Sequence, residues 1–399
     1  MKKKYLLVAI FSIMTVFLIR IGMGFLYTDY SNKHIKIGFV YIGDSGTPYT
    51  NNFVRSQVEL ESYFPENVTT LAKYNIPEDK CEPAIRDLIE SGCDLIFGTS
   101  YGYGDIMKKL AMEFPKIQFC QATCSNANEA PVLPNYHTFM GTIYQGRYIS
   151  GIVTGMKLRE LIEQKKLTPA QAKIGYVAAF PYAEVISGYT AFFLGVRSVV
   201  SEAVMTVSYT NTWSNTTTER KLAEKLIDEG CVIIAQHSDT TGPATACETA
   251  STRDGKLVFH VGYNQTMTDV APTTSLVSTR INWTPYFISA AEAVIREKKI
   301  ETLVKGQVNG NDSAAGFDYG WCEMIGLNKL IAAEGTKEEI ESKIKQFKTK
   351  GIIVFQGDYT GVNPFDPSDT YNLNDPYIEN ALQSAPSFHY VLKDVITIR

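Results

Sequence analysis

The sequence predicts an α/β protein of two lobes, each a parallel sheet flanked by helices, with a ligand cleft between the lobes. Two short passages recur at nearly the same separation. Residues 36–41 (KIGFVY) return 137 residues later as KIGYVA, and residues 88–93 (LIESGC) return 138 residues later as LIDEGC. Each copy is typical of a strand, a helix that ends at glycine, and a second strand. Such units build parallel sheets that bind ligands at the carboxyl ends of their strands.

The bulk composition fits this prediction and excludes one class of partner. The chain has 399 residues, of which 45% are hydrophobic and 20% are charged, as expected for two well-packed globular domains. Its net charge of −4 gives no electrostatic reason to expect binding to nucleic acid. The 23 tyrosines suit a site that stacks a planar ligand, because tyrosine combines a flat apolar face with a hydroxyl group.

The first 27 residues predict export. Three lysines follow Met1, and an apolar run covers 5–19 before Arg20 interrupts it. A run of about 15 residues is short for a membrane-spanning helix, which needs about 20. A cleaved signal peptide and an uncleaved membrane anchor therefore both remain open, and 28–35 is the expected linker. We expect a periplasmic protein or one on the extracytoplasmic face of the plasma membrane. A lipid-modified N-terminal cysteine is excluded because Cys81 is the first cysteine.

The cysteines and histidines predict no metal site and no cofactor. Seven cysteines cannot all pair with one another, so at least one thiol is free or bonded elsewhere. Cys93 and Cys231 fall within predicted buried strands and are expected to act as small hydrophobic residues. No spacing of cysteine and histidine typical of a structural metal site occurs.

The pattern from 36 to 140 predicts the first lobe. Four strands are expected, at 35–41, 68–72, 95–98 and 116–122. Helices are expected at 51–64, at 82–90 and up to about 114, and Gly92 is the expected C-cap of the second.

The second lobe is expected at 141–279, beginning with a helix whose small residues favour close helix packing. A strand at 275–279 is expected to return the chain to the first lobe, which 280–320 then completes with a helix from 286 to about 298. The segment 321–399 is assigned to neither lobe. It is expected to hold a helix at 337–348, a strand at 352–356, and an Asp-, Asn- and Pro-rich tail at 358–375.

The loops at the predicted strand ends carry aromatic, amide, hydroxyl and carboxylate groups. Such a set can enclose a planar ring and bond its nitrogens and exocyclic groups, with Glu184 and Asp239 as hydrogen-bond acceptors. The alternative for either tryptophan is that it only fills the interface between the lobes. The candidate ligand-binding residues are Ser45, Tyr49, Thr99, Ser100, Tyr101, Phe180, Glu184, Trp213, Gln236, Asp239, Tyr263, Asn282 and Trp283.

An enzymatic function is not expected. Ser45, His237 and Asp239 are the residue types of a hydrolytic triad, but Ser45 does not stand in a GxSxG motif. His237 is expected to be a hydrogen-bonding wall residue of the cleft. The glycine-rich stretch at 98–104 lacks the Lys-Ser/Thr pair of a phosphate-binding loop.

Five short passages follow one another along the chain: DLIFGTSYGY at 94–103, EFP at 113–115, YQGRYISG at 144–151, KIGYVAAFP at 173–181 with EVISG at 184–188, and NWTPY at 282–286. In this order they resemble the BMP family of substrate-binding proteins, named for basic membrane lipoproteins and including a purine nucleoside receptor of ABC transporters. The resemblance covers roughly 35–300. It implies a fold like that of type I periplasmic binding proteins, whose lobes close on a ligand that a membrane permease then accepts.

Two departures from the family pattern bear on the ligand. The loop at 43–49 (GDSGTPY) replaces an Asp-Asp-x-Ser-Phe-Asn-like loop, and Asn264 stands where nucleoside-binding members carry an aspartate suited to ribose hydroxyls. The sequence is closer to the branch associated with free purine bases, so we predict an adenine-like nucleobase or a related nucleoside as ligand. The alternative function is a membrane-tethered ectodomain that senses a purine or another small molecule.

Overall fold

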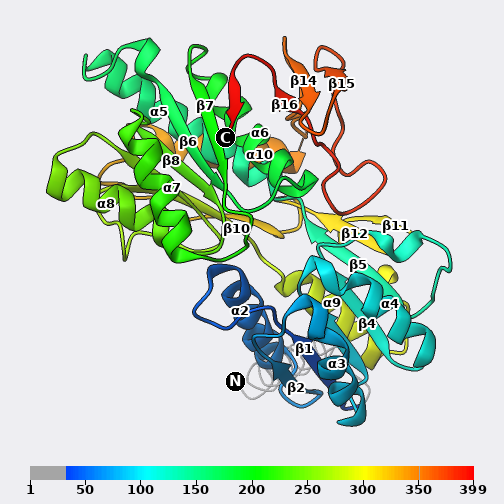
Figure 1. The fold of residues 1–399 in the computed structure, drawn as a ribbon. Helices are drawn as coiled ribbons and strands as arrows, with labels where there is room; N and C mark the ends of the chain where they lie inside the picture. Colours follow the sequence, from blue (N-terminus) through cyan, green and yellow to red (C-terminus); the bar gives the residue numbers. More distant parts are fainter. Residues whose placement is uncertain (1–32, 350) are drawn as a thin grey trace, which may run out of the picture.

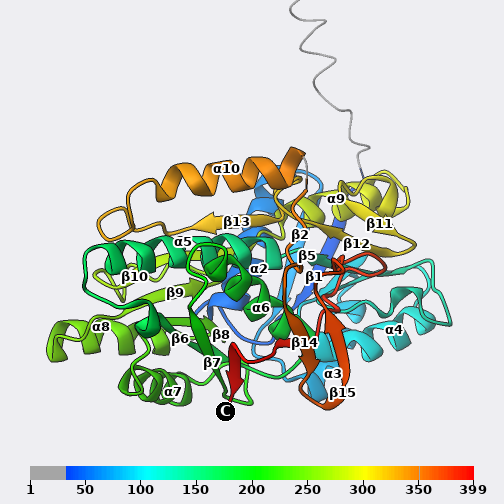
Figure 2. The same cartoon turned by 90° about the horizontal axis from the view of Figure 1, so that it is seen from above.

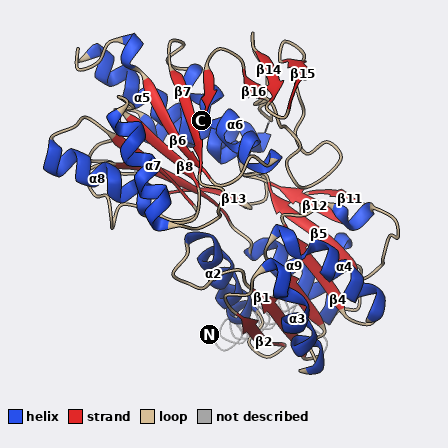
Figure 3. Cartoon of the chain, viewed as in Figure 1, coloured by secondary structure: helices blue, strands red, loops and turns tan. Residues whose placement is uncertain are grey.

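The computed structural model describes residues 33–349 and 351–399, and two large sheets organise them into two lobes (Figure 1). The predicted signal peptide or anchor lies outside these residues. Within the described part, no helix combines the length and the apolar character needed to cross a membrane. Helices flank both sheets, so the predicted α/β class is confirmed (Figure 3).

The first lobe contains a seven-stranded sheet in the order β11-β12-β5-β4-β3-β1-β2. All neighbouring strands are parallel except β11 and β12. The strands are β1 (Ile35–Val40), β2 (Val68–Lys73), β3 (Leu95–Gly98), β4 (Gln118–Ala122), β5 (Tyr136–Gly141), β11 (Gln307–Asn309) and β12 (Asp312–Ala315). The helices are α2 (Pro48–Tyr63), α3 (Cys81–Glu90), α4 (Gly104–Glu113) and α9 (Thr284–Ile295).

The second lobe contains a seven-stranded sheet in the order β13-β10-β9-β8-β6-β7-β17, with only β13 antiparallel to its neighbour. The strands are β6 (Lys173–Ala178), β7 (Val204–Tyr209), β8 (Ile233–His237), β9 (Phe259–Tyr263), β10 (Ser275–Ile281), β13 (Cys322–Ile325) and β17 (Ile396–Ile398). The helices are α5 (Tyr144–Glu163), α6 (Ala183–Arg197), α7 (Thr216–Asp228), α8 (Gly242–Asp254) and α10 (Thr336–Thr349), and α10 lies along α5 (Figure 2).

The internal repeat has a structural reason. The order β5-β4-β3-β1-β2 in the first sheet matches the order β10-β9-β8-β6-β7 in the second. In each lobe the two recurring passages touch each other. A Cβ atom on Gly38 of β1 would lie 2.9 Å from Leu88 Cδ1, and one on Gly175 of β6 would lie 2.8 Å from Leu226 Cβ. The glycine therefore lets the helix approach the central strand, which explains why both passages recur together.

The helix rich in small residues packs closely, as predicted. On α5, a Cβ atom on Gly151 would lie 1.8 Å from the carbonyl oxygen of Phe192 on α6, so only glycine fits there. Closely packed helices on the second sheet hold the elements behind the cleft at fixed positions. All seven cysteines are described, and all are buried free thiols.

The structure corrects two expectations for the later part of the chain. The strand expected to return to the first lobe is β10, which pairs with β9 in the second sheet, and the return begins only at α9. Residues 352–356 form no strand, and only a single bridge joins Phe355 to Tyr377. The polar tail contains β14 (Thr360–Asn363) and β15 (Asp366–Asn372), which form a small sheet with β16 (Val391–Leu392). Most of β15 is exposed, so it shows no apolar alternation in sequence.

The described chain passes between the lobes at 141–144, 281–284 and 315–322, and these crossings bond to one another. The Thr142 amide donates to the Ala315 carbonyl at 2.8 Å, and the Asn282 amide donates to the Trp321 carbonyl at 2.9 Å. Gly141 lies at this junction, where a Cβ atom would be 2.7 Å from Ile281 Cγ2. The crossings therefore form one compact hinge.

A C-terminal segment, 379–388, contacts both lobes (Figure 1). We call it the C-terminal strap. Glu379 is buried and accepts hydrogen bonds from the Ser187 hydroxyl of α6 at 2.9 Å and from the Ser387 and Phe388 amides of the strap itself at 2.6 and 3.1 Å. On the first lobe, the Ser384 amide donates to Asp312 Oδ2 at 2.6 Å. The strap is thus a non-covalent connection between the lobes.

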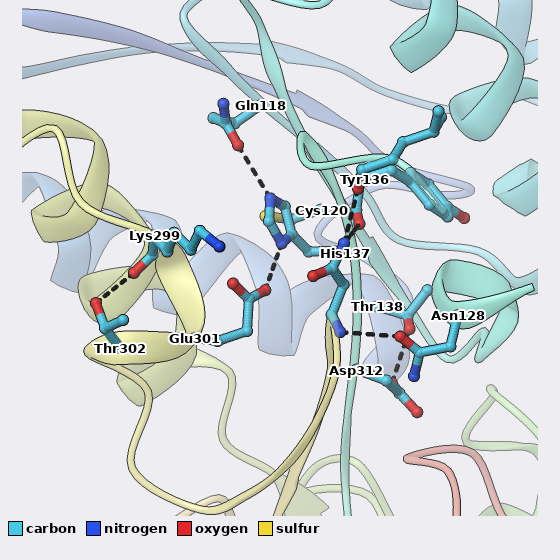
Figure 4. A network of polar contacts seen from close by, with 12 residues as sticks. Gln118, Cys120, Asn128, Tyr136, His137, Thr138, Lys299, Glu301, Thr302 and Asp312 are labelled. Carbon is cyan, nitrogen blue, oxygen red and sulfur yellow. Dashed lines mark hydrogen bonds and ion pairs between the residues drawn. The ribbon is translucent and has the colours of Figure 1, made fainter. Parts of the chain in front are cut away.

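Buried polar contacts fix the returning segment to the first sheet (Figure 4). His137 on β5 lies with Nδ1 2.5 Å from Glu301 Oε1 and Nε2 3.0 Å from Gln118 Oε1. Burial raises the pKa of Glu301, but the hydrogen bond and charge interaction with His137, together with a backbone hydrogen bond and the charge of Lys299, outweigh burial and lower the pKa. The Thr138 hydroxyl also donates to Asp312 at 2.7 Å. These contacts fasten the edge of the sheet to which the strap binds.

The core of the first lobe is rich in aromatic rings, and Trp283 lies within it. Its side chain is 1% exposed. It stacks on Phe53 of α2, with ring centroids 4.4 Å apart and planes 14° apart, and meets Phe139 of β5 edge-on at 5.5 Å. Trp283 precedes α9, so this stacking attaches the returning chain to the lobe.

Replacing Glu379 by alanine is expected to lower the free energy of unfolding by about 2–4 kcal/mol, because several buried donors lose their acceptor. Urea denaturation should show a lower midpoint with an unchanged slope. Glu334→Ala, at an exposed glutamate before α10, is the control and should change stability by less than about 0.5 kcal/mol. Equal effects of the two substitutions would contradict the role given to the strap.

Trp283→Ala is expected to destabilise the protein by about 3–5 kcal/mol, the usual cost of removing a large buried aromatic side chain. Trp283→Phe keeps a ring against Phe53 and should cost clearly less. Thermal or chemical denaturation of both variants measures the difference. A Trp283→Ala variant of wild-type stability with weakened ligand binding would instead place this residue in the ligand site.

Candidate functional site

A pocket lies where the two lobes face each other, at the carboxyl ends of the strands of both sheets. Its empty space is about 420 Å³, including its opening to solvent. This is within the usual size range of small-molecule sites. The residues that line it are Ile42, Tyr49, Ser100, Tyr101, Thr123, Glu184, Trp213, His237, Asp239 and Tyr263. None of these is lysine or arginine, so the wall offers no cation to an anionic ligand.

The first lobe supplies one wall from loops that follow β1, β3 and β4. Tyr49, in the first turn of α2, donates from its hydroxyl to the Thr99 carbonyl at 2.5 Å, which fixes its ring. The Ser100 hydroxyl donates to Glu78 Oε1 at 2.6 Å. Thr123 directly follows β4. This wall therefore presents a held aromatic ring beside hydroxyl groups.

The second lobe supplies a wall that is aromatic and acidic. Trp213 meets Phe180 edge-on at 5.0 Å. The Tyr263 ring carries the Arg147 guanidinium on one face, 3.8 Å from the ring centroid. Arg147 is fully buried, and its Nη1 donates to the Gln236 carbonyl at 3.0 Å. Because Arg147 supports Tyr263 from behind, it adds positive charge near the pocket without lining it.

The lobes touch across the cleft, as in a closed conformation. The Asn52 amide group of α2 donates to Asn264 Oδ1 at 3.1 Å, and Asn264 Nδ2 in turn donates to Asp239 Oδ1 at 3.2 Å. At the opening, the exposed rings of Tyr101 and Tyr182 stack with centroids 6.1 Å apart. In the pair Asn52–Asn264 and in the pair Tyr101–Tyr182, the first residue belongs to the first lobe and the second residue to the second lobe. Separation of the lobes would therefore break both contacts.

Burial dominates the protonation of the pocket. The pKa of Asp239 is raised to about 8, first by burial and then by the nearby carboxylate of Glu219, while the hydrogen bond from Asn264 opposes this rise. The pKa of His237 is lowered by burial, although Glu184, whose Oε1 lies 3.7 Å from His237 Nε2, partly offsets the effect. Neutral forms of both side chains are therefore favoured near pH 7.

Half of the fourteen predicted site residues line this pocket. These are Tyr49, Ser100, Tyr101, Glu184, Trp213, Asp239 and Tyr263. Two more lie directly behind them. Phe180 packs against Trp213, and Asn264 bonds to Asp239. Whether these residues bind ligand stays a prediction.

The structure places five predicted residues elsewhere. Ser45 is exposed in the loop before α2. The Thr99 hydroxyl donates to the Val40 carbonyl, and the buried Gln236 amide donates to the carbonyls of its own strand-end loop. Asn282 caps its own loop by accepting from the Thr284 amide, and Trp283 belongs to the core of the first lobe. Of these five side chains, three form hydrogen bonds with backbone groups, one packs in the core and one is exposed. None of them lines the pocket.

Several residues at the site were not predicted from sequence. Thr123 directly follows a strand, so the rule that selected the other loops would have found it. Asn52, Arg147 and Glu219 lie inside helices, where the pattern does not reveal which polar side chain faces the cleft. His237 lines the pocket, in keeping with its expected place in the wall.

Comparison with known proteins gives the family. The family model for PnrA-like ABC transporter substrate-binding proteins, Bmp, matches residues 42–356. A purine-binding protein of Brucella abortus is 31% identical over 67% of this chain and 70% of its own length. A Haloferax volcanii protein with the provisional name of ABC transporter glucose-binding protein is 32% identical over 65% of this chain and 61% of its own length.

A solved structure supports the fold at low sequence identity. An ABC transporter solute-binding protein of Aeropyrum pernix is 14% identical, with a TM-score of 0.63 over 84% of this chain and 95% of that one. The family model, the Brucella relative and the two-lobed architecture agree with the resemblance carried by the sequence motifs. The chain therefore belongs to the Bmp family of PnrA-like ABC transporter substrate-binding proteins.

Proposed function

We propose that this protein captures a purine nucleobase, adenine or a close relative, by closure of its lobes, and delivers it to an ABC transporter permease on the outer face of the plasma membrane. The observation that carries this proposal is the composition of the pocket. Aromatic rings from both lobes, Tyr49 among them, stand beside two carboxyl groups and no cation. Such a wall suits a flat, uncharged ring with nitrogen donors and acceptors.

The contacts of Asn264 favour a base over a riboside. Both ends of its amide are engaged, by Asn52 and by Asp239. An asparagine so held offers no charged acceptor for a pair of ribose hydroxyls. A sugar moiety would have to break the contact between the lobes that this residue makes.

Closure requires that the ligand bind more tightly to the closed form than to the open form. The division of the pocket between the lobes supplies this difference. Tyr49 and Ser100 come from the first lobe, and Trp213 and Asp239 come from the second, so all four can contact one ligand only when the lobes meet. The function needs no catalytic step.

A panel of ligands tests the proposal. We expect adenine, but not adenosine, to raise the melting temperature of the protein, since a ligand at 100 times its dissociation constant adds about 2.7 kcal/mol of stability. The panel also includes guanine, hypoxanthine, xanthine, their ribosides and amino acids. Glucose and other sugars belong in it because of the name of the Haloferax relative. A response to ribosides alone would contradict the proposal that the ligand is a free base. A response to sugars alone would contradict the proposal that the ligand is a purine.

Trp213→Ala is expected to weaken adenine binding by about 1–3 kcal/mol, the range for loss of one aromatic stacking surface. Its partly exposed position predicts little change in melting temperature. Isothermal titration calorimetry measures the affinity. Phe365→Ala, at an exposed ring in the distant C-terminal hairpin, is the control and should bind as the wild type does. Unchanged affinity in Trp213→Ala would mean that the ligand binds elsewhere.

A further inference from the structure

We propose that Asp239 binds the ligand as a neutral carboxylic acid, donating a hydrogen bond to a ring nitrogen and accepting one from an adjacent amino group. This inference rests on the proposed function and deepens it, because it names the residue that selects the ligand edge. It differs from the expectation that both pocket carboxyls act only as acceptors.

A neighbouring carboxyl group, that of Glu219 on α7, lies within a set of hydrogen-bond donors. It is fully buried, and four donors surround it. The Asn215 amide donates to Oε1 at 2.9 Å. The Ser238 hydroxyl, the Thr240 hydroxyl and the Thr240 amide donate to Oε2 at 2.8, 2.7 and 3.2 Å. Hydrogen bonds of this kind favour the ionised form of a carboxyl group.

Asp239 has no such set of donors. Its side chain receives one hydrogen bond, from Asn264 Nδ2 to Oδ1, and no described residue donates to Oδ2. Asn52 holds the Asn264 amide in the orientation that makes this bond. Of these two buried carboxyl groups, Asp239 is therefore the one with fewer hydrogen bonds to stabilise a negative charge, and its second oxygen is left for the ligand.

The charges around Asp239 agree with this assignment. Two acidic side chains face it, Glu219 from α7 and Glu184 from α6, and one cation, Arg147 from α5, opposes them. His237 brings no second cation, because burial lowers its pKa. Tyr49 and Tyr263 complete the surroundings, and burial raises the pKa of both phenols so that they stay neutral. The group formed by Asp239, Glu219, Glu184 and Arg147 has a net charge of −1 when Asp239 is protonated and −2 when it is ionised.

The protonation state decides which ligand edge fits. A neutral acid presents one donor and one acceptor, and it therefore matches a bare ring nitrogen beside an amino group, as on a 6-aminopurine. An ionised carboxylate presents acceptors only and would place its charge against the lone pair of that nitrogen. The pocket is thus expected to prefer heterocycles that carry an acceptor next to a donor.

Asp239→Asn separates the two states, because the amide presents a donor group and an acceptor group but cannot ionise. Calorimetry with adenine at about pH 6 and about pH 9 is the experiment. With a pKa of about 8, wild-type affinity should fall about tenfold between these conditions, as ionisation removes the donor. Asp239→Asn should bind within about threefold of the wild-type value at the lower pH and should show no such fall. Asp269→Asn, at an exposed aspartate, should behave as the wild type.

Loss of adenine binding in Asp239→Asn alone would overturn the inference, because it would show that an ionised acceptor is required. A pH dependence that persists in this variant would also overturn it.

A readout without ligand keeps this test independent of the proposed function. In the wild type the folded state keeps a proton on Asp239 that the unfolded state has lost, so stability should fall from about pH 4 to about pH 8 relative to Asp239→Asn. Parallel stability curves for the two proteins would contradict the inference. If the wild type binds no purine, the proposed function fails, and this comparison still decides the state of Asp239.

Discussion

Both lobes depend on one geometric constraint, namely that the central strand of each sheet runs parallel to its neighbours on both sides. In the first sheet β1 lies between β2 and β3, and in the second β6 lies between β7 and β8. Helical crossovers then bring every following loop to the same edge of the sheet. Tyr49 and Asp239 are 190 positions apart in the sequence, yet they line one pocket because each follows the carboxyl end of a strand.

The pocket combines apolar surfaces with more acid than base. Such a site is costly to empty of water unless its polar groups find partners. The protein meets this requirement in two ways. Asn52 and Asn264 connect the lobes, with Asn264 also donating to Asp239, and the Arg147 guanidinium packs on the face of Tyr263. The remaining hydrogen-bonding capacity is directed into the pocket, where a small-molecule ligand can use it.

The sequence was sufficient for the class of fold and for most of the residues that line the candidate pocket. The passages that recur contain a glycine and a leucine that touch in both lobes, and their recurrence predicted the two sheets. The ends of the predicted strands then selected the loops that carry candidate site residues. The expectation that residues after strand ends line the pocket failed where a loop side chain points away from the pocket. Gln236 bonds its own loop, and Trp283 fills the core, because direction within a loop depends on tertiary packing. Arg147 and Glu219 were missed since polar residues within a helix carry no pattern for the face they occupy. The exposed hairpin of β14 and β15 was missed for lack of apolar alternation.

The C-terminal strap constrains how the cleft can open. It lies beyond residue 356, where the match to the family model ends, and is fastened to α6 of one lobe and to Asp312 of the other. A rotation that parts the lobes therefore has two routes. It can pivot about an axis that passes close to the strap, which leaves these bonds intact, or it can detach the strap from one side. A pivot near the strap would fix the direction in which the lobes separate. Detachment of the strap would instead add an energetic barrier to their separation. In either case, separation of the lobes is restrained partly by residues that neither line the pocket nor belong to the covalent hinge.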